Sequence, residues 1–129
     1  MIYLDTSVLL AHLLAEDRHP PTEIWDEPLV ASRLMEYEAW VRLRSRGLEE
    51  SHGGHLRDAL ARVGFLEMVG PVLERAVTGF PVPLRTLDAL HLASADFLRA
   101  QGAPVRLASY DERLLEGARA VKVPVYPLS

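Results

Sequence analysis

Short apolar runs alternate along the chain with longer segments of helical periodicity. The apolar runs predict strands at Ile2–Leu4, Pro28–Ala31, Phe65–Val69 and Val105–Ala108, with a last short strand at Val123–Tyr126. Most of these runs are apolar throughout rather than alternately apolar and polar. That pattern is typical of a parallel sheet whose strands are buried on both faces.

The segments between these runs carry the start and stop signals of helices. Ser32 is a predicted cap for the strongest helix of the first half, which Gly47 closes, and Gly102 follows the strongest helix of the second half. The predicted helices are Thr6–Leu14, Thr22–Asp26, Ser32–Arg46, Glu49 or His55 to Val63, Pro71 to about Gly79, Thr86 to about Gln101, and Asp111–Ala120. The alternation predicts a three-layer α/β fold with a central, mostly parallel sheet of four to five strands flanked by helices.

Length and composition favour one ordinary globular domain spanning residues 1–129. No apolar run approaches the ~20 residues that a membrane-spanning helix needs. Asp5 interrupts the first residues and no basic leader precedes them, so they do not resemble a signal peptide. We therefore expect a cytoplasmic protein without a membrane partner. The absence of Cys excludes disulfides and thiolate metal sites.

The net charge of −4 argues against a protein that coats nucleic acid with a basic surface. It leaves open an enzyme that acts on nucleic acid, because a bound metal ion supplies positive charge locally.

Four acidic residues stand where such a sheet would bring them together. Asp5 ends the first strand, Asp111 follows the fourth, and Asp88 lies in the first turn of its helix. Ligands of parallel sheets bind at the carboxyl ends of the strands. Glu38, in the helix after the second strand, joins this edge if its helix crosses it. We therefore expect all four carboxylates to converge.

Each acid also has a purely structural interpretation. Asp5 alone is a good N-cap, Asp88 alone complements a helix dipole, and Asp111 competes with Ser109 as a cap. These alternatives stay open for the single residues; the four together favour one site.

For Glu38, the structural alternative is a solvated ion pair with Arg42, four residues later. However, its helical neighbours Leu34 and Val41 are apolar, so it is expected to project from an apolar face. A carboxylate on such a face needs a partner.

Clustered carboxylates repel one another unless a cation lies between them, and hard oxygen ligands suit Mg²⁺ or Mn²⁺. We expect Asp5 and Asp88 to be direct ligands and Asp111 to bind directly or through water. Glu38 is either a ligand or the group that positions and deprotonates the attacking water.

Neighbouring polar residues have expected supporting roles. Thr6 and Ser109 are candidates to hydrogen-bond the carboxylates, although Thr6 is equally compatible with an early-helix structural role. Ser7 is expected to serve only the first helix. His91, one turn after Asp88, is interpreted as a hydrogen-bonded packing residue that lies within reach of the site.

Two further patterns carry weaker signals. The spacing of His52 and His55 around two glycines is poor for zinc. Arg42, Arg44 and Arg46 offer a basic rim for RNA phosphates, or simply a solvated helix end.

Taken in order, these phrases resemble PIN-domain ribonucleases, specifically the VapC type of toxin from bacterial toxin–antitoxin pairs. The matching phrases are Leu4-Asp5-Thr6-Ser7 with Leu9-Leu10, Ser32-x-Leu34 leading to Glu38, Leu87-Asp88-Ala89-Leu90-His91-Leu92-Ala93-Ser94-Ala95, and Ser109-Tyr110-Asp111-x-x-Leu114. The likeness covers essentially the whole chain. Ser109 stands where Thr is common and Trp40 where a smaller residue is frequent, and neither departure removes a carboxylate.

The resemblance implies an Mg²⁺- or Mn²⁺-dependent endonuclease that cuts RNA to leave a 5′-phosphate and a 3′-hydroxyl. It also implies a homodimer and a VapB-type antitoxin that blocks the acidic pocket.

Other functions stay open at this point. One is a PIN nuclease of RNA processing outside toxin–antitoxin systems, and another is a catalytically silent PIN-like binding module. A phosphotransfer domain is disfavoured, because Asp5 lacks the paired acid of receiver domains and the Asp-x-Asp of dehalogenase-type phosphatases, and the only lysine, Lys122, is badly placed.

Overall fold

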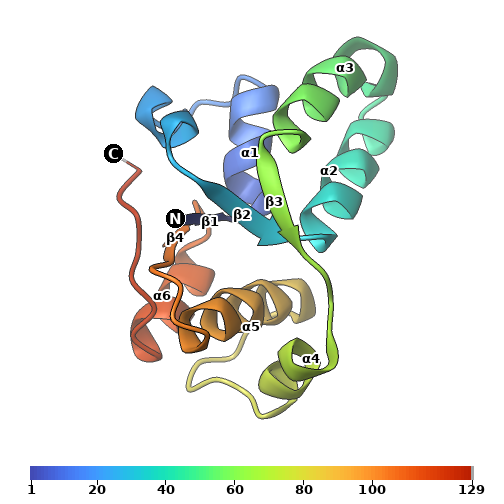
Figure 1. Ribbon diagram of the computed structural model, residues 1–129. Helices are drawn as coiled ribbons and strands as arrows, with labels where there is room; N and C mark the ends of the chain where they lie inside the picture. The colour runs from blue at the N-terminus through green and yellow to red at the C-terminus, as the bar shows by residue number, and fades with distance from the viewer. Residues whose placement is uncertain (129) are drawn as a thin grey trace.

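A parallel sheet lies at the centre of the computed structural model, which describes residues 1–128 (Figure 1). Its strands are β1 (Ile2–Leu4), β2 (Leu29–Ser32), β3 (Val63–Leu66) and β4 (Arg106–Ala108). All neighbours pair in parallel, in the order β3-β2-β1-β4. The apolar runs therefore predicted the sheet type correctly.

Helices cover both faces of this sheet. They are α1 (Thr6–Leu13), the 3₁₀ helix η1 (Thr22–Asp26), α2 (Leu34–Ser45), α3 (Glu49–Leu60), α4 (Gly70–Val77), α5 (Thr86–Ala100) and α6 (Glu112–Ala120). Figure 1 shows α1, α2 and α3 on one face and α4, α5 and α6 on the other. The three-layer α/β architecture expected from the sequence is confirmed.

The side chains of β1 alternate between two hydrophobic clusters, one on each face of the sheet. Ile2 and Leu4 pack in the cluster that includes α1, α2 and α3, whereas Tyr3 packs with α5 and α6. All three are completely buried. A strand with both faces covered needs apolar side chains at every position, which explains why the run is uninterrupted.

Some predicted boundaries were wrong. The third strand begins at Val63, two residues before the predicted start, and α3 ends at Leu60 rather than Val63. Pairing with β2 fixes this register, with Val63 opposite Leu29 and Leu66 opposite Ser32. The start of β3 was missed because Gly64 interrupts the apolar run and glycine is uncommon in strands.

The helix predicted to begin at Ser32 begins two residues later. Ser32 is the last residue of β2, and α2 starts at Leu34. The Ser32 hydroxyl nevertheless accepts a hydrogen bond from the Leu34 backbone N–H at 3.2 Å. Ser32 was predicted to cap this helix, but the N-cap position is Arg33, whose side chain makes no capping hydrogen bond. Ser32 binds the first N–H of α2 from one residue further back.

The predicted last strand, Val123–Tyr126, is reduced to a single bridge between Val125 and Leu107. The Leu107 N–H donates to the Pro124 carbonyl, and the Tyr126 N–H donates to the Leu107 carbonyl, both at 2.8 Å. Pro124 has no N–H to add to a ladder, so the segment follows β4 without forming a full strand.

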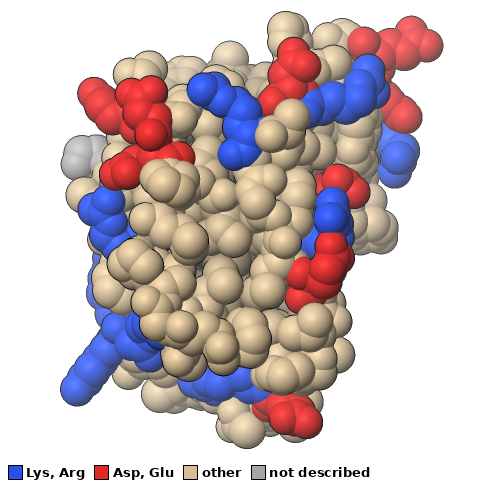
Figure 2. Space-filling model, viewed as in Figure 1, with Lys and Arg blue, Asp and Glu red and all other residues tan. Residues whose placement is uncertain are grey.

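The surface carries charges of both signs. On the face in Figure 2, Lys and Arg lie around the periphery, interspersed with Asp and Glu, and the centre is uncharged. Within the part of the chain that the structure describes, no helix is long and apolar enough to cross a membrane.

Candidate active site

The chain changes direction at the carboxyl ends of β1 and β4. After β1 it builds β2 and β3 on one side, and it then returns to add β4 on the other side of β1. The Asp5 N–H donates to the Ala108 carbonyl at 3.0 Å, which ties the two strand ends together. Connections that diverge in this way leave a crevice above the strand ends, where ligands bind in sheets of this kind.

A cavity of about 480 Å³ opens at this point. All four acids predicted from the sequence line it: Asp5, Glu38, Asp88 and Asp111. They come from the end of β1, from α2, from the first turn of α5 and from the residue before α6. The predicted convergence of the carboxylates is therefore present.

Asp5 is nearly buried, with 5% of its surface exposed. Its Oδ2 accepts hydrogen bonds from the Ser7 hydroxyl at 2.7 Å and from the Ser109 hydroxyl at 2.9 Å. Asp5 occupies the N-cap position of α1, but its side chain makes no capping hydrogen bond. Its carboxylate therefore belongs to the cavity rather than to the helix end.

The prediction that Ser7 serves only the first helix was wrong. Besides donating to Asp5, the Ser7 hydroxyl accepts a hydrogen bond from the Tyr110 N–H at 3.0 Å. It thereby joins the start of α1 to the loop after β4. Ser109 has a similar double role, since its hydroxyl accepts from the Asp111 N–H at 2.9 Å.

Glu38 reaches the cavity from α2, and only one of its two carboxylate oxygens, Oε1, takes part in the hydrogen bonds with Thr6 and His91. Its Oε1 accepts from the Thr6 hydroxyl at 2.9 Å and lies 2.6 Å from Nε2 of His91. The hydrogen bonds predicted for Thr6 and Ser109 are thus both present, while their contribution to catalysis stays a prediction. Glu38 was also expected to project from an apolar face flanked by Leu34 and Val41. That expectation was less accurate, because Val41 is 40% exposed.

His91 is completely buried beneath these carboxylates. Its Nδ1 lies 2.7 Å from the Tyr3 hydroxyl, and Nε2 faces Glu38. Burial alone would lower the pKa of the imidazole, but the hydrogen bond to Glu38 and the charges of Asp5, Glu38 and Asp88 hold that pKa above its ordinary value. The interpretation of His91 as a hydrogen-bonded packing residue is confirmed, and the structure adds its contact with Glu38.

Asp88 and Asp111 complete the cavity in different ways. Partial burial, followed by repulsion from Asp111 and Asp5, raises the pKa of Asp88 to about 6. Oδ1 of Asp111 accepts from the backbone N–H groups of Arg113 at 2.9 Å and Leu114 at 3.2 Å. Asp111 therefore caps α6 and lines the cavity at the same time, so its two interpretations are compatible.

The raised pKa of Asp88 reflects first its partial burial and then the negative charges of Asp111 and Asp5. Within residues 1–128, no group of three or more acidic or histidine side chains is arranged to hold a metal ion as it stands. The carboxylates surround the cavity but would have to move toward one another to share an ion. Their oxygen chemistry nevertheless suits a hard divalent cation.

Three arginines line the same cavity: Arg18, Arg42 and Arg85. Of the predicted rim, only Arg42 is among them, and Arg44 instead lies 3.4 Å from the carboxylate of Glu49 in an ion pair. Sequence reasoning missed Arg18 and Arg85, which precede η1 and α5 and carry no motif.

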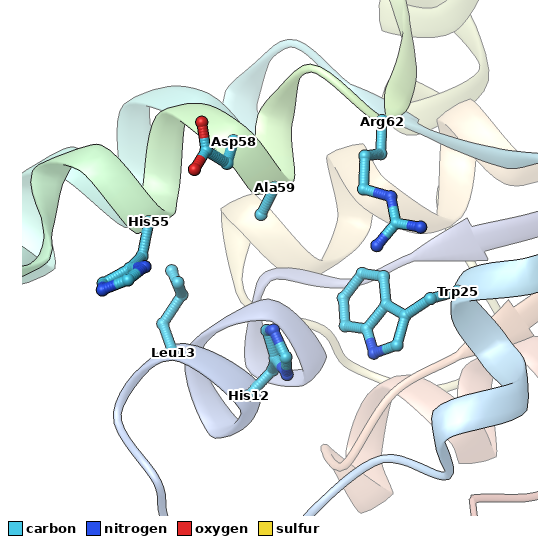
Figure 3. A pocket seen from close by; sticks show the side chains of 7 residues that line it. All are labelled: His12, Leu13, Trp25, His55, Asp58, Ala59 and Arg62. Carbon is cyan, nitrogen blue, oxygen red and sulfur yellow. The ribbon is translucent and has the colours of Figure 1, made fainter.

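A second cavity, of about 320 Å³, lies at the other end of α1 (Figure 3). Figure 3 shows His12 of α1 and His55 of α3 on opposite sides of it, with Arg62 beside Trp25. His52 is not part of its lining and instead lies 2.7 Å from the Ser51 hydroxyl. The two histidines of the weak zinc pattern therefore do not share a site.

Comparisons with known proteins agree with this geometry. The sequence model of the PIN domain family matches residues 2–120. The chain is 32% identical to Ribonuclease VapC47 of Mycobacterium tuberculosis (strain CDC 1551 / Oshkosh), over 94% of this chain and 92% of that protein. It is also 32% identical to Ribonuclease VapC46 of M. tuberculosis (strain ATCC 25618 / H37Rv), over 96% and 95% of the two chains.

Solved structures share the fold at lower identity. A toxin–antitoxin complex from Klebsiella pneumoniae matches with a TM-score of 0.69 and 19% identity over 98% of both chains. VapBC2 from Rickettsia felis, bound to a DNA fragment from its promoter, matches with a TM-score of 0.71 and 14% identity over the same shares. On the family match and the similarity to the two ribonucleases, the chain belongs to the PIN-domain family and, within it, to the VapC group.

Proposed function

We propose that this protein is a metal-dependent endoribonuclease of the toxin class, which hydrolyses phosphodiester bonds of RNA in the cytoplasm. The observation that carries the proposal is the convergence of Asp5, Glu38, Asp88 and Asp111 on one cavity. The relatives named as ribonucleases, which align over almost the whole chain, support RNA as the substrate. The expected products carry a 5′-phosphate and a 3′-hydroxyl.

The metal in this proposal is Mg²⁺ or Mn²⁺, held by Asp5 and Asp88, with Asp111 and Glu38 completing the site. Such an ion, when bound, neutralises charge on the phosphate and lowers the pKa of a bound water. The donor set fits, since all four groups are carboxylates and hard oxygen ligands suit these ions. The raised pKa of Asp88 also fits, because an added cation would favour the charged carboxylate against the burial and the repulsion that raise this pKa.

The other residues of the cavity orient these acids and bind the substrate. Ser7 and Ser109 hold one oxygen of Asp5, so its other oxygen keeps a fixed direction. Arg18, Arg42 and Arg85 line the cavity beside the acids. They would bind the phosphates that flank the scissile bond, since an all-acidic pocket would repel RNA.

The proposal includes a VapB-type antitoxin and a homodimer. One solved structure of the same fold is described as a toxin–antitoxin complex and another as VapBC2, and these support the partner. Co-expression with the product of an adjacent short gene should suppress cleavage, and light scattering should give twice the chain mass of 14.4 kDa for the free protein. A nuclease of RNA processing would instead cut RNA without such a gene nearby.

The deciding experiment uses the purified protein freed of any partner. It should cut single-stranded RNA when Mg²⁺ or Mn²⁺ is added and stop when EDTA is added. Asp5→Asn should abolish the cutting, whereas Asp58→Asn, an exposed residue of α3 at the second cavity, should cut normally. If the parent protein binds RNA without cutting it under any metal, the alternative of a silent binding module is correct.

A further inference from the structure

A buried series of hydrogen bonds runs from the sheet to Glu38. The Ser32 N–H, at the end of β2, donates to the Tyr3 hydroxyl at 3.0 Å. That hydroxyl lies 2.7 Å from Nδ1 of His91, and Nε2 of His91 lies 2.6 Å from Oε1 of Glu38. Tyr3 and His91 are both completely buried. The series therefore joins β2, β1, α5 and α2 without contact with solvent until it reaches the carboxylate.

The direction of the last hydrogen bond is set by chemistry. An ionised carboxylate only accepts, so Nε2 of His91 must carry a proton and donate to Glu38. This holds for the neutral ring and for the cationic ring alike. In the neutral ring, Nδ1 accepts the Tyr3 hydroxyl proton, which fixes the tautomer that leaves the proton on Nε2.

Neither Tyr3 nor His91 lines the acidic cavity, so neither side chain is positioned to touch RNA or a metal ion. Their effect passes through side chains that do line it. Nε2 of His91 lies 2.6 Å from Oε1 of Glu38, its shortest contact there, and 3.5 Å from the Thr6 hydroxyl and 4.0 Å from Oδ1 of Asp5. Among residues 1–128, the hydrogen bonds of the Glu38 carboxylate go to Oε1, from Thr6 at 2.9 Å and from His91. Oε2 is then the oxygen that is free to act in the cavity.

Electrostatics explains why Glu38 needs such a restraint. Asp5 and Asp88 line the same cavity, and their negative charges repel the charge of Glu38. The Glu38 side chain is already 18% exposed, so it lies at the boundary with solvent and has room to turn outward. The buried N–H of His91 opposes this outward turn of Glu38, because water cannot reach that N–H to replace the carboxylate as its hydrogen-bond partner.

We propose that His91, oriented by Tyr3, is the positioning residue that fixes Glu38 in the cavity and thereby sets the rate of RNA cleavage. The effect on cleavage rests on the proposed function, whereas the restraint on Glu38 does not. A residue that supports a group next to a metal site typically changes activity 10–100-fold when it is replaced.

The first test replaces His91 by Leu and by Gln. His91→Leu removes the donor but keeps an apolar side chain of similar bulk, so kcat should fall by about 10-fold or more while KM for RNA stays within about twofold. His91→Gln carries an amide N–H that can reach the position of Nε2, and it should recover most of the lost kcat. If His91→Leu keeps the parent kcat, or if His91→Gln is no better than His91→Leu, the proposal is wrong.

Tyr3→Phe tests the other end of the series and covers the case in which His91→Leu fails to fold. It removes one hydroxyl from a buried ring and should lower kcat less than His91→Leu does, again with KM unchanged. An unchanged kcat in Tyr3→Phe would remove Tyr3 from the proposal. His52→Gln is the matched control. It makes the same exchange on α3, where the His52 ring lies 2.7 Å from the hydroxyl of the neighbouring Ser51 and is not part of the acidic cavity, so it should leave kcat unchanged.

A spectroscopic test separates this inference from the proposed function. In the metal-free protein with ¹⁵N-labelled histidine, the proton on Nε2 of His91 should give a strongly deshielded, slowly exchanging NMR signal. Glu38→Ala should move that signal upfield or remove it. A signal that does not respond to Glu38→Ala refutes the hydrogen bond and the proposal with it. A parent protein that gives the expected signal but does not cut RNA refutes only the proposed function.

Discussion

Asp88→Asn should make the metal-free protein more stable at neutral pH while it abolishes RNA cleavage. The pKa of Asp88 is raised to about 6 by partial burial and by the charges of Asp111 and Asp5. The folded protein therefore holds a proton on Asp88 at pH values where the unfolded chain has released it. Stability is lost as the pH rises from about 4 through 6, because the charged carboxylate is better tolerated in the unfolded chain. An asparagine keeps the shape and avoids that loss.

The expected gain in stability follows from the size of the shift in the pKa of Asp88. One pKa unit corresponds to about 1.4 kcal/mol, so the full shift sets an upper limit of about 3 kcal/mol. Asp88 is only half-buried, and solvent screening reduces the expected gain to about 1 kcal/mol. For a domain of this size, that gain corresponds to a rise in Tm of about 4 °C.

The assay is thermal unfolding in EDTA at pH 4 and at pH 8. The parent and Asp88→Asn should unfold at nearly the same temperature at pH 4, and the variant should unfold about 4 °C higher at pH 8. At pH 8, an excess of Mn²⁺ should raise the Tm of the parent and leave that of the variant almost unchanged.

Asp96→Asn is the control on the same helix, because the pKa of Asp96 is shifted in the opposite direction and the expected change in Tm is opposite too. Burial alone would raise the pKa of Asp96, but the hydrogen bonds from Arg75 and Arg99 outweigh it and hold that pKa below its ordinary value. Asp96→Asn should therefore lower the Tm at pH 8. If Asp88→Asn is also less stable than the parent at pH 8, or if its gain is equal at both pH values, burial and neighbouring charge do not raise the pKa of Asp88 as argued.

Three further variants test other parts of the molecule. Thr6→Val removes a donor to Glu38 and should lower kcat by about 10-fold with the Tm little changed, as steady-state kinetics and thermal unfolding would measure. Arg85→Ala should weaken RNA binding, and if Arg85 contacts one phosphate, the log–log slope of affinity against salt should fall by about 0.7 in a titration with single-stranded RNA. Gly47→Ala should lower the free energy of unfolding by about 1 kcal/mol in urea without affecting cleavage, because Gly47 ends α2 at a φ of 67°.

The acids of the site could be predicted because they follow strongly marked elements. Asp5 comes directly after one apolar run, Asp111 follows another by three residues, and Asp88 lies in the first turn of the best helix of the second half. Parallel strands bring their carboxyl ends to one edge, so the sequence order is enough to gather these side chains. The boundary of β3 could not be found in the same way, since Gly64 breaks the apolar run and only the pairing with β2 sets its register.

The residues that hold the acids depend on contacts between distant elements. Ser7 looks like an ordinary helix residue until β4 brings the Tyr110 N–H and Ser109 beside it. Tyr3 looks like one apolar residue of a buried strand, and its hydroxyl acquires a role only because β2 and α5 bring Ser32 and His91 to it. No spacing along the chain predicts such contacts, because they link residues 29 and 88 positions apart.

The acids of the cavity differ in how they are supported, and this difference suggests how the site works. Two hydroxyls hold Asp5, and a hydroxyl and an imidazole hold Glu38, so both charges are stabilised by the protein itself. Asp88 differs, because partial burial and the charges of Asp111 and Asp5 raise its pKa to about 6. A cation beside Asp88 would therefore stabilise its charged form. It follows that metal affinity should fall steeply as the pH drops through 6, because a proton and the ion compete for the same oxygen atoms.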